Sequence, residues 1–434
     1  METPRRNPKR KLSETADVAD GIPDDPLGEA CRPLTPQEIE DWKGWVELES
    51  EPAFFNIILR DLGVRNAKVQ ELFAIDQESL EAVAKPVLGL IFLFQYEPGH
   101  DEKEQQQDTE SGIWFANQTT NNACATVALL NILMNARDID LGQQLTEFRE
   151  RTRSLSTSLR GHSISSNAFI RTIHNSFTRR MDHLNADLCL ENEVEDASKN
   201  SASSSKARKR SNRRRQSTLE YGYHFIAYVP FDGHVWELDG LQSCPLKLGP
   251  VVDADWTAIA KPQIEARMFQ YQGSQLSFNL LAVCGSSLLR HGQTIATMVA
   301  AMQVMQMHFK DGHNPMFNNL VSSDEHLLDM TKPTQLTEFN LTLSDIQNAE
   351  LPAELKLVIS RPSWLVEEDA CDVFREIQSQ LKAAINEYRI ELSNIREDEG
   401  RVRSRKRDYG GALHCWVKKL AHRGVLEDII KMSV

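Results

Sequence analysis

The stretch "NQTTNNACATVALLNILMN", residues 117–135, places a single cysteine between a polar turn and an apolar run. After Cys124, apolar side chains recur three and four residues apart, which is typical of a buried helix. Asn121 and Asn122 are good N-cap and turn residues, so we expect Cys124 in or beside the first helical turn. The N–H groups and the helix dipole at that end favour an anion, and they lower the pKa of a thiol.

Taken alone, this stretch favours a cysteine that simply packs well in a core, and two further features favour a nucleophile. The first is Gln118, which precedes Cys124 in the same polar loop. Its amide N–H would face an oxyanion that forms beside the sulfur.

The second feature is a hairpin, "YHFIAYVPFDGHVWELDG", residues 223–240. Asp232 and Gly233 form a strong signal for a two-residue turn between strands. If Phe231 pairs with His234, the register of every other pair follows. A register slipped by one residue would exchange the two faces of the strand, so the prediction depends on the turn type.

In the expected register, His224 and Asp239 are diagonal neighbours on one face, roughly 7–8 Å apart at the backbone. The carboxylate would hold the imidazole, and the imidazole would take the proton of Cys124. The sequence therefore predicts a nucleophile, a base and an orienting acid. Five other histidines lack such a partner and are expected to be surface or structural residues: His162, His174, His234, His308 and His414. Asp253 and Asp255 are interpreted as caps of a following helix rather than an acid pair.

The composition, with 41% hydrophobic and 26% charged residues in 434, indicates a soluble globular protein with disordered pieces attached. The longest wholly apolar run, "VLGLIFLF" at 87–94, is too short to cross a bilayer, so no membrane association is expected. The basic N-terminus has no apolar stretch behind it, which argues against a secretory signal. Seven scattered cysteines without a C-x-x-C pair favour an intracellular protein with neither a disulfide framework nor a zinc site. No cofactor is expected.

Composition also divides the chain. Residues 1–38 are expected to be a disordered basic and acidic tail, and 39–290 the ordered domain that carries the predicted site. Within that domain, 189–220 has almost no large apolar side chain and is expected to form a long flexible excursion. Residues 291–362 are expected to be a partly helical connector, and 363–434 a helical C-terminal extension with a long amphipathic helix.

Two segments of the domain have clear local signals. In "PAFFNIILRDLG", apolar residues at helical spacing predict a helix that ends near Gly63. The uniformly apolar "PVLGLIFLFQY" between Pro86 and Pro98 predicts a central strand buried on both faces.

Three stretches, "NQTTNNACATVALLNILMN", "YHFIAYVP" and "HVWELDGL", closely resemble the motifs of the ubiquitin C-terminal hydrolases, the papain-like family of cysteine deubiquitinases. The resemblance covers residues 42–285 and is closest to the long branch, which contains proteasome- and chromatin-associated members. It implies that 39–290 is a catalytic domain of the α+β class. The implied fold is papain-like, with a mainly antiparallel central sheet flanked by helices, followed by a helical extension.

The resemblance also implies roles for four residues. Cys124 is the expected nucleophile, His224 the general base and acid, Asp239 the residue that orients it, and Gln118 the oxyanion donor. The segment 189–220 corresponds to the family's crossover, which passes over the active site and limits what threads through.

The expected function is thiol hydrolysis of peptide or isopeptide bonds after the C-terminal glycine of ubiquitin, in protein turnover or chromatin regulation. Two alternatives remain: a ubiquitin-binding adaptor whose C-terminal helices matter more than catalysis, and a general papain-like protease. Expected partners are ubiquitin and ubiquitinated proteins, with a proteasome or chromatin complex bound through 363–434.

The net charge of −13 argues against general nucleic-acid binding, yet basic residues cluster at 5–11, 206–215 and 401–407. The block Lys206–Arg215 is interpreted as a nuclear import signal, a contact to nucleosomal DNA or a solvated loop. With the basic N-terminus, it predicts location in the nucleus as well as the cytoplasm.

Overall fold

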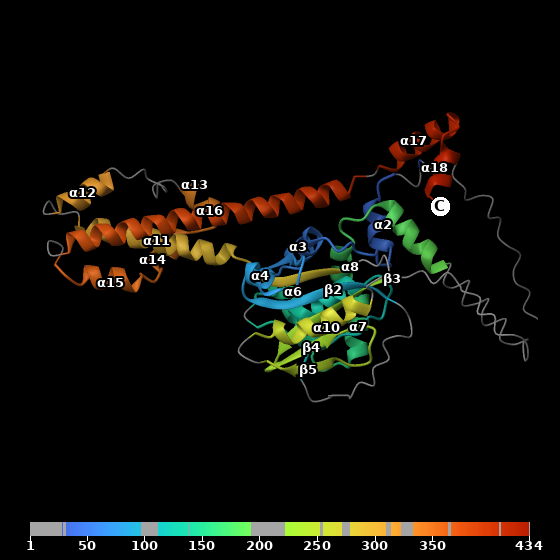
Figure 1. The fold of residues 1–434 in the computed structure, drawn as a ribbon, viewed down its shortest axis with the longest axis horizontal. Coiled ribbons are helices and arrows are strands. Elements are labelled where there is room, and N and C mark those ends of the chain that lie inside the picture. Colours follow the sequence, from blue (N-terminus) through green and yellow to red (C-terminus); the bar gives the residue numbers. More distant parts are fainter. Residues whose placement is uncertain are drawn as a thin grey trace, which may run out of the picture. The chain divides into compact units, whose positions relative to one another are not determined.

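The computed structural model of the protein (Figure 1) describes residues 28, 32–96, 112–137, 139–191, 222–251, 255–270, 278–309, 314–322, 333–362, 366–407 and 409–433. The chain divides into two compact units. The large unit comprises Glu47–Ser176 and Ser211–Ser404, and the small unit comprises Met1–Val46, Phe177–Arg210 and Arg405–Val434.

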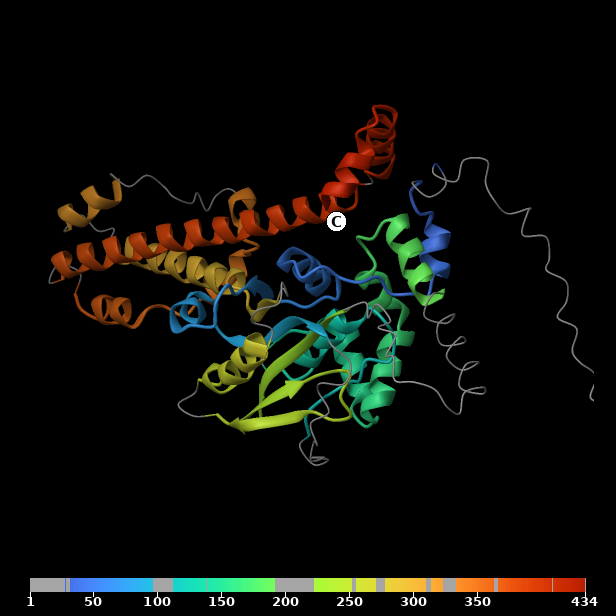
Figure 2. The same ribbon diagram turned by 45° about the vertical axis from the view of Figure 1, so that its right-hand side comes forward.

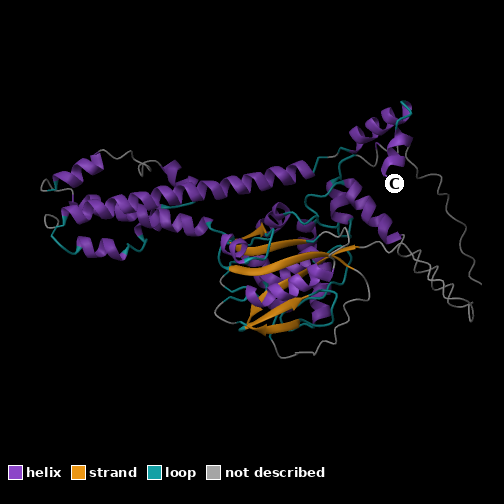
Figure 3. Cartoon of the chain, in the orientation of Figure 1, coloured by secondary structure: helices purple, strands orange, loops and turns teal. Residues whose placement is uncertain are grey.

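The centre of the large unit is a six-stranded sheet in the order β1-β6-β2-β3-β4-β5, drawn in orange in Figure 3. Every neighbouring pair of these strands is antiparallel. The strands are β1 (Ala67–Glu71), β2 (Val87–Tyr96), β3 (Gly222–Phe231), β4 (His234–Leu238), β5 (Leu246–Pro250) and β6 (Asn279–Gly285). The predicted α+β class with an antiparallel central sheet is confirmed.

Strand β2 is central, as its apolar sequence predicts, and helices cover both of its faces. On one face, α10 (Thr257–Gln270) packs Ala260 and Ile264 in one cluster with Phe92 of β2. On the other face, α5 (Cys124–Leu133) approaches so closely that a Cβ on Gly89 would lie 2.7 Å from the Ile132 side chain. A glycine is therefore needed at this point of the strand.

The other helices of the sheet domain are α3 (Pro52–Asp61), α4 (Gln77–Ala82), α6 (Gly142–Thr152), α7 (Thr157–Ser166) and α8 (Ala168–His174). Helix α3 ends before Gly63, whose φ of 88° terminates it as the sequence predicts. The sequence from Gly142 to His174 forms three consecutive helices, α6, α7 and α8. Ser156 and Asn167 each cap a new helix by accepting a backbone N–H, which divides the run.

A helical arm follows the sheet domain. It contains α11 (Leu288–Phe309), α12 (Pro315–Ser322), α13 (Pro333–Glu338), α14 (Leu343–Gln347), α15 (Ala353–Ile359) and most of α16 (Glu367–Arg405). Helices α11 and α16 run side by side in Figures 1 and 2. The long amphipathic helix predicted in 363–434 is α16, and its apolar stripe is buried there: Phe374, Ile377, Leu381, Ala384 and Tyr388. Phe374 is fully enclosed beside Phe309 and Phe317. The stripe thus packs on helices of the same chain.

Polar contacts join the arm to the sheet domain. Lys68 of β1 pairs with Glu391 of α16 at 2.7 Å, with 18% and 9% of the side chains exposed. Asn56 of α3 donates to Asp398 at 2.8 Å. Because these contacts are charged and partly shielded from water, they fix the direction of α16 against the sheet domain.

The small unit contains α2 (Pro36–Asp41), a helix at 180–191, and α17 (Gly410–His422) with α18 (Leu426–Ser433). Helix α2 begins inside the expected tail because Thr35 and Glu38 form a capping box. The ring of Trp42 stacks on His183 at 3.8 Å, which fastens this segment to the helix at 180–191. None of the described helices has the length and hydrophobicity needed to span a membrane.

Candidate active site

Cys124 is the first residue of α5, and only 7% of its surface is exposed. The prediction that an asparagine caps this helix is wrong: the N-cap is Ala123, which makes no side-chain cap. Asn122 has a φ of 62° and forms the turn before the helix, a conformation that asparagine tolerates better than most residues. Because the N-cap is an alanine, no N-cap side chain accepts from the N–H groups of the first turn.

The hairpin has the expected register. Phe231 pairs with His234, and the turn residues Asp232 and Gly233 have φ values of 48° and 71°. Two positive φ values define the turn type that keeps two strands in register across a two-residue connection. The register therefore follows from the turn.

This register brings His224 and Asp239 together. The distance between His224 Nε2 and Asp239 Oδ1 is 2.7 Å, and the two side chains are 5% and 2% exposed. The N–H of Leu241 donates to the same carboxylate oxygen at 3.0 Å. The carboxylate is therefore fixed from two directions, and it fixes the imidazole ring in turn.

The protonation of His224 depends on its burial and on two groups, Asp239 and Cys124. Burial disfavours the imidazolium, but hydrogen bonds with Asp239 and with Cys124 outweigh it and raise the pKa of His224 to about 9. Burial alone would raise the pKa of Asp239, and the hydrogen bond with His224 lowers it overall. At neutral pH the site therefore holds an imidazolium between a carboxylate and the sulfur.

Gln118 lies in the extended segment that precedes α5. Its backbone N–H donates to Gly240 O at 2.8 Å, and its side-chain Nε2 donates to Thr120 O at 3.0 Å. The amide has two hydrogens on Nε2, so one stays available for an incoming oxygen. The contact with Gly240 ties this segment to the residue that follows Asp239.

Two asparagines that the sequence analysis missed hold this segment on α5. The side chain of Asn135 accepts from Trp114 N at 2.8 Å and donates to Trp114 O at 2.7 Å. Asn131 accepts from Ala116 N at 2.9 Å and donates to Ala116 O at 3.3 Å. Asn131 lies in α5 and Asn135 follows its C-cap, Met134. Two amides four residues apart in an otherwise apolar run were a visible signal, because buried polar groups need partners.

Asn117 also holds this segment, and we call Asn117, Asn131 and Asn135 the asparagine clamp. Two glycines let the backbone pack closely beside it. Asn117 Nδ2 donates to Gln242 O at 2.6 Å, and its backbone N–H donates to Thr157 O at 3.1 Å. A Cβ on Gly161 of α7 would lie 2.0 Å from Asn117 O, and one on Gly240 would lie 3.1 Å from Gln118 N. The segment beside Cys124 therefore depends on close backbone approach at both glycines.

A buried ion pair lies behind the histidine. Arg267 Nη2 is 2.6 Å from Glu237 Oε1, and the side chains are 8% and 3% exposed. The guanidinium lies over the ring of Phe94 at 5.2 Å, and Phe94 contacts His224 edge-on with ring centroids 5.9 Å apart. The ion pair therefore supports the surroundings of His224 through Phe94.

The structure places the remaining predicted residues outside this cluster. His162 is exposed on α7, whereas His174 is fully buried and bonds through Nδ1 to Thr126 Oγ1 at 2.7 Å. Asp255 accepts from Thr257 N at 3.0 Å at the start of α10, in the capping position expected of it. Asp253 and most of the expected crossover, including the basic block 206–215, lie outside the described residues. Within the described part of the chain, no group of three or more His, Cys, Asp or Glu side chains is arranged to hold a metal.

A cysteine at a helix N-terminus, a buried histidine and an aspartate behind it define the class of papain-like thiol hydrolases. The sequence model of ubiquitin carboxyl-terminal hydrolase, family 1, matches residues 45–269, more than half of the 434 residues, and the chain belongs to this family. The family resemblance drawn from the motifs is confirmed.

Two relatives illustrate the extent of the similarity. Ubiquitin carboxyl-terminal hydrolase isozyme L5 of Dictyostelium discoideum is 36% identical over 241 residues, which cover 56% of this chain and 62% of that protein. Ubiquitin carboxyl-terminal hydrolase ubh-4 of Caenorhabditis elegans is 36% identical over 246 residues, with 56% and 67% covered. A crystal structure of Trichinella spiralis UCH37 bound to ubiquitin vinyl methyl ester is 30% identical, with a TM-score of 0.44, and the match covers 58% of this chain and 86% of that one.

Proposed function

We propose that the protein hydrolyses peptide or isopeptide bonds after the C-terminal glycine of ubiquitin. One observation carries the proposal: His224 Nε2 lies 2.7 Å from Asp239 Oδ1, and Cys124 is one of the groups that raise the pKa of His224. Membership of the family and relatives that bear the name ubiquitin carboxyl-terminal hydrolase support ubiquitin as the substrate.

In the proposed mechanism, Cys124 attacks the carbonyl carbon of the scissile bond as a thiolate. The proton of the thiol resides on His224, and this imidazolium then protonates the departing amine. Asp239 holds the ring in one orientation and stabilises its positive charge. The product of this half-reaction is a thioester between Cys124 and ubiquitin.

The tetrahedral intermediate carries a negative oxygen. Gln118 Nε2 and a backbone N–H in the first turn of α5 are its proposed donors. Water then attacks the thioester with His224 as base and releases ubiquitin. The first-turn N–H groups supply partial positive charge without a cofactor.

The test uses ubiquitin with a small fluorogenic amide at its C-terminus. Cys124→Ser should abolish turnover, and Gln118→Ala should lower kcat about 100- to 1,000-fold while ubiquitin still binds. Near-normal turnover by Cys124→Ser would refute the mechanism. A thiol-reactive ubiquitin probe separates the enzyme from an adaptor, because an adaptor would bind the probe without forming a bond to Cys124. Digestion of unrelated unfolded proteins would instead indicate a general protease.

Substrate size is a further part of the proposal. The expected crossover, at 189–220, should admit larger leaving groups because of its length and polar composition. Shortening 195–216 should reduce cleavage of diubiquitin more than cleavage of the small amide. Unchanged selectivity would contradict this role.

We also propose location in the nucleus as well as the cytoplasm, and a partner complex, proteasome or chromatin, bound through 363–434. The support for location is the basic sequence at Lys206–Arg215. The support for a partner is the exposed apolar surface of α17 and α18, where Trp416 is 58% and Ile430 54% exposed. Exclusion of the protein from nuclei would refute the first. Affinity purification that recovers the same complex with and without 363–434 would refute the second.

A further inference from the structure

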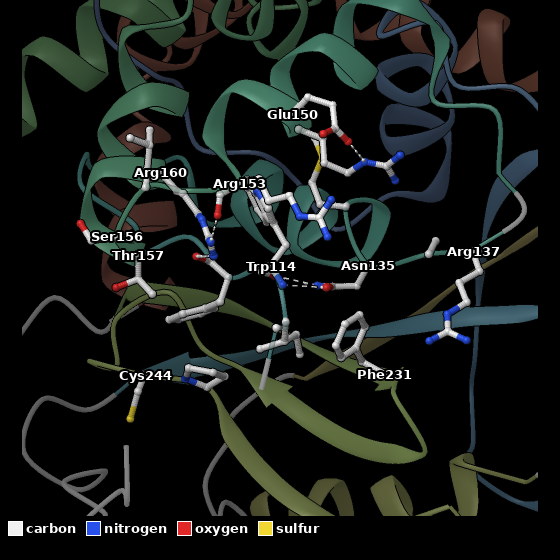
Figure 4. Close-up of a pocket in the computed structure, with 18 of the residues that line it drawn as sticks. Trp114, Asn135, Arg137, Glu150, Arg153, Ser156, Thr157, Arg160, Phe231 and Cys244 are labelled. Carbon is white, nitrogen blue, oxygen red and sulfur yellow. Dashed lines mark hydrogen bonds and ion pairs between the residues drawn. The ribbon is translucent and has the colours of Figure 1, made fainter. Parts of the chain in front are cut away.

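A cleft of about 710 Å³ lies in the large unit (Figure 4), and none of the four proposed catalytic residues lines it. Met134, Asn135 and Arg137, which directly follow the C-terminal end of α5, contribute to its wall. Cys124 is at the opposite end of this helix, and ten residues at 1.5 Å each separate the two ends by roughly 15 Å. A ligand in the cleft would therefore leave the sulfur accessible.

Four arginines and a single carboxylate line the cleft: Arg137, Arg149, Arg153, Arg160 and Glu150. Arg149 lies 4.0 Å from Glu150, and Arg137 lies 3.9 Å from Asp232 outside the cleft. Both pairs are long and partly or largely exposed, so they neutralise little charge. No side chain among the described residues forms an ion pair with Arg153.

Arg160 is held in place by neutral partners. It donates to the carbonyl oxygens of Thr152, Phe115 and Arg153 at 3.1, 3.2 and 2.7 Å. Its guanidinium carbon is 5.7 Å from the centroid of the Trp114 ring. Carbonyl and aromatic partners orient a guanidinium without cancelling its charge, so Arg160 keeps the cleft positive at a fixed position.

Apolar side chains form the rest of the wall. Met134, Leu155 and Phe231 line the space between the arginines, and Figure 4 draws Phe231 below Asn135 and beside Arg137. A mixture of guanidinium groups and apolar surface suits a chain that alternates carboxylates with apolar atoms. It suits a bare phosphate or a nucleic-acid backbone less well, because neither uses the apolar part.

We propose that this cleft is a second binding site that takes an acidic peptide segment of a partner or substrate protein. The carboxylates of the peptide pair with Arg137, Arg149 and Arg153, and its apolar atoms contact Phe231 and Met134. Planar guanidinium groups bind carboxylates through two parallel hydrogen bonds, which gives the site its preference. Because the cleft contains no residue of the proposed catalytic cluster, the proposal does not depend on hydrolysis.

The experiment measures binding of a fluorescein-labelled hexaglutamate peptide to the full chain by fluorescence anisotropy, with hexaglutamine as the neutral probe. Hexaglutamate should bind and hexaglutamine should not. Arg137→Ala with Arg153→Ala should weaken binding roughly 10- to 100-fold, the range for loss of charged hydrogen bonds. Arg361→Ala is the matched control, because this arginine is 62% exposed and 3.7 Å from Asp369, outside the cleft.

Arg137→Glu alone provides a second variant, since its side chain is 75% exposed and its replacement leaves the core intact. It should weaken binding at least as much as the double alanine variant. Hexaglutamate should still bind after a ubiquitin probe has reacted with Cys124. It should also bind if the probe does not react, so failure of the proposed hydrolysis would not remove this site. Equal binding by wild type and the Arg137 and Arg153 variants would overturn the proposal. So would tighter binding of a DNA duplex than of hexaglutamate to the same arginines.

Discussion

His224 Nε2 and Asp239 Oδ1 lie 2.7 Å apart, although fifteen residues of chain separate them. The two-residue turn at Asp232 and Gly233 sets this distance, because its positive φ values permit only one pairing of Phe231 with His234. The orientation of the histidine is therefore a consequence of the hairpin.

The first prediction concerns pH. The pKa of His224, about 9, lies above the ordinary value of 6.5, so the imidazolium is present at neutral pH and is lost as pH rises through about 9. Asp239→Asn removes a group that raises this pKa. The alkaline limb of kcat/KM should therefore move to lower pH, and kcat should fall roughly 100- to 10,000-fold.

The control for this prediction is Asp255→Asn, which changes a helix cap and not the histidine. Its pH profile should match that of wild type. The contact between His224 and Asp239 should stabilise the folded protein fully below pH 6.5, the ordinary pKa of histidine. This stabilisation should be lost as the pH rises through about 9, because the pKa of His224 is raised to that value in the folded protein. An Asp239→Asn protein with the same alkaline limb as wild type would contradict the assignment of the imidazolium.

A second prediction concerns the asparagine clamp. Asn135→Ala removes both hydrogen bonds to Trp114 and leaves a buried N–H and C=O without their partner. The free energy of unfolding should fall by about 1–3 kcal/mol for each such group, measured by urea denaturation. Asn348→Ala, which breaks an exposed contact to Ser344, should cost far less. Equal losses in the two variants would show that the clamp does not stabilise the fold.

Gly161 provides a third prediction. Gly161→Ala places a methyl group 2.0 Å from Asn117 O and must displace the backbone next to Gln118. A displacement near 1 Å should lower kcat by roughly 100-fold with a smaller change in KM. Alkylation of Cys124 by iodoacetamide should proceed at the normal rate, because the sulfur and His224 are untouched.

The matched control is Gly400→Ala on α16, where an added Cβ meets nothing within 4 Å. Its activity should equal that of wild type. If Gly161→Ala slowed alkylation as much as turnover, the glycine would act on the cysteine and not on Gln118, the proposed oxyanion donor.

The fourth prediction addresses the buried pair of Arg267 and Glu237. Arg267→Met leaves an uncompensated carboxylate that is 3% exposed, and should destabilise the protein by about 3–5 kcal/mol. The double variant with Glu237→Leu should recover part of that loss, because no unpaired charge remains. Urea denaturation of the two single variants and the double variant tests this, and strictly additive losses would contradict it.

The sequence alone was sufficient to predict the conformation of a segment where the interactions that decide it are local. The turn at Asp232 and Gly233 fixed the hairpin, the apolar run at 87–94 marked the central strand, and Gly63 marked the end of α3. In each case the conformation depends on neighbours within a few residues, so the residue types alone carry the information. The pairing of His224 with Asp239 followed for the same reason.

Other features depended on segments distant in the sequence. Whether Asn131 and Asn135 would point to solvent or hold the backbone at 114–116 was decided only when that segment packed against α5. The same is true of the stripe on α16, which is equally compatible with another protein and with α11. A periodic pattern states which face is buried but not what covers it, because the covering surface comes from elsewhere in the chain. The site therefore required the tertiary structure to bring Gln118, Gly240 and Gly161 together beside Cys124.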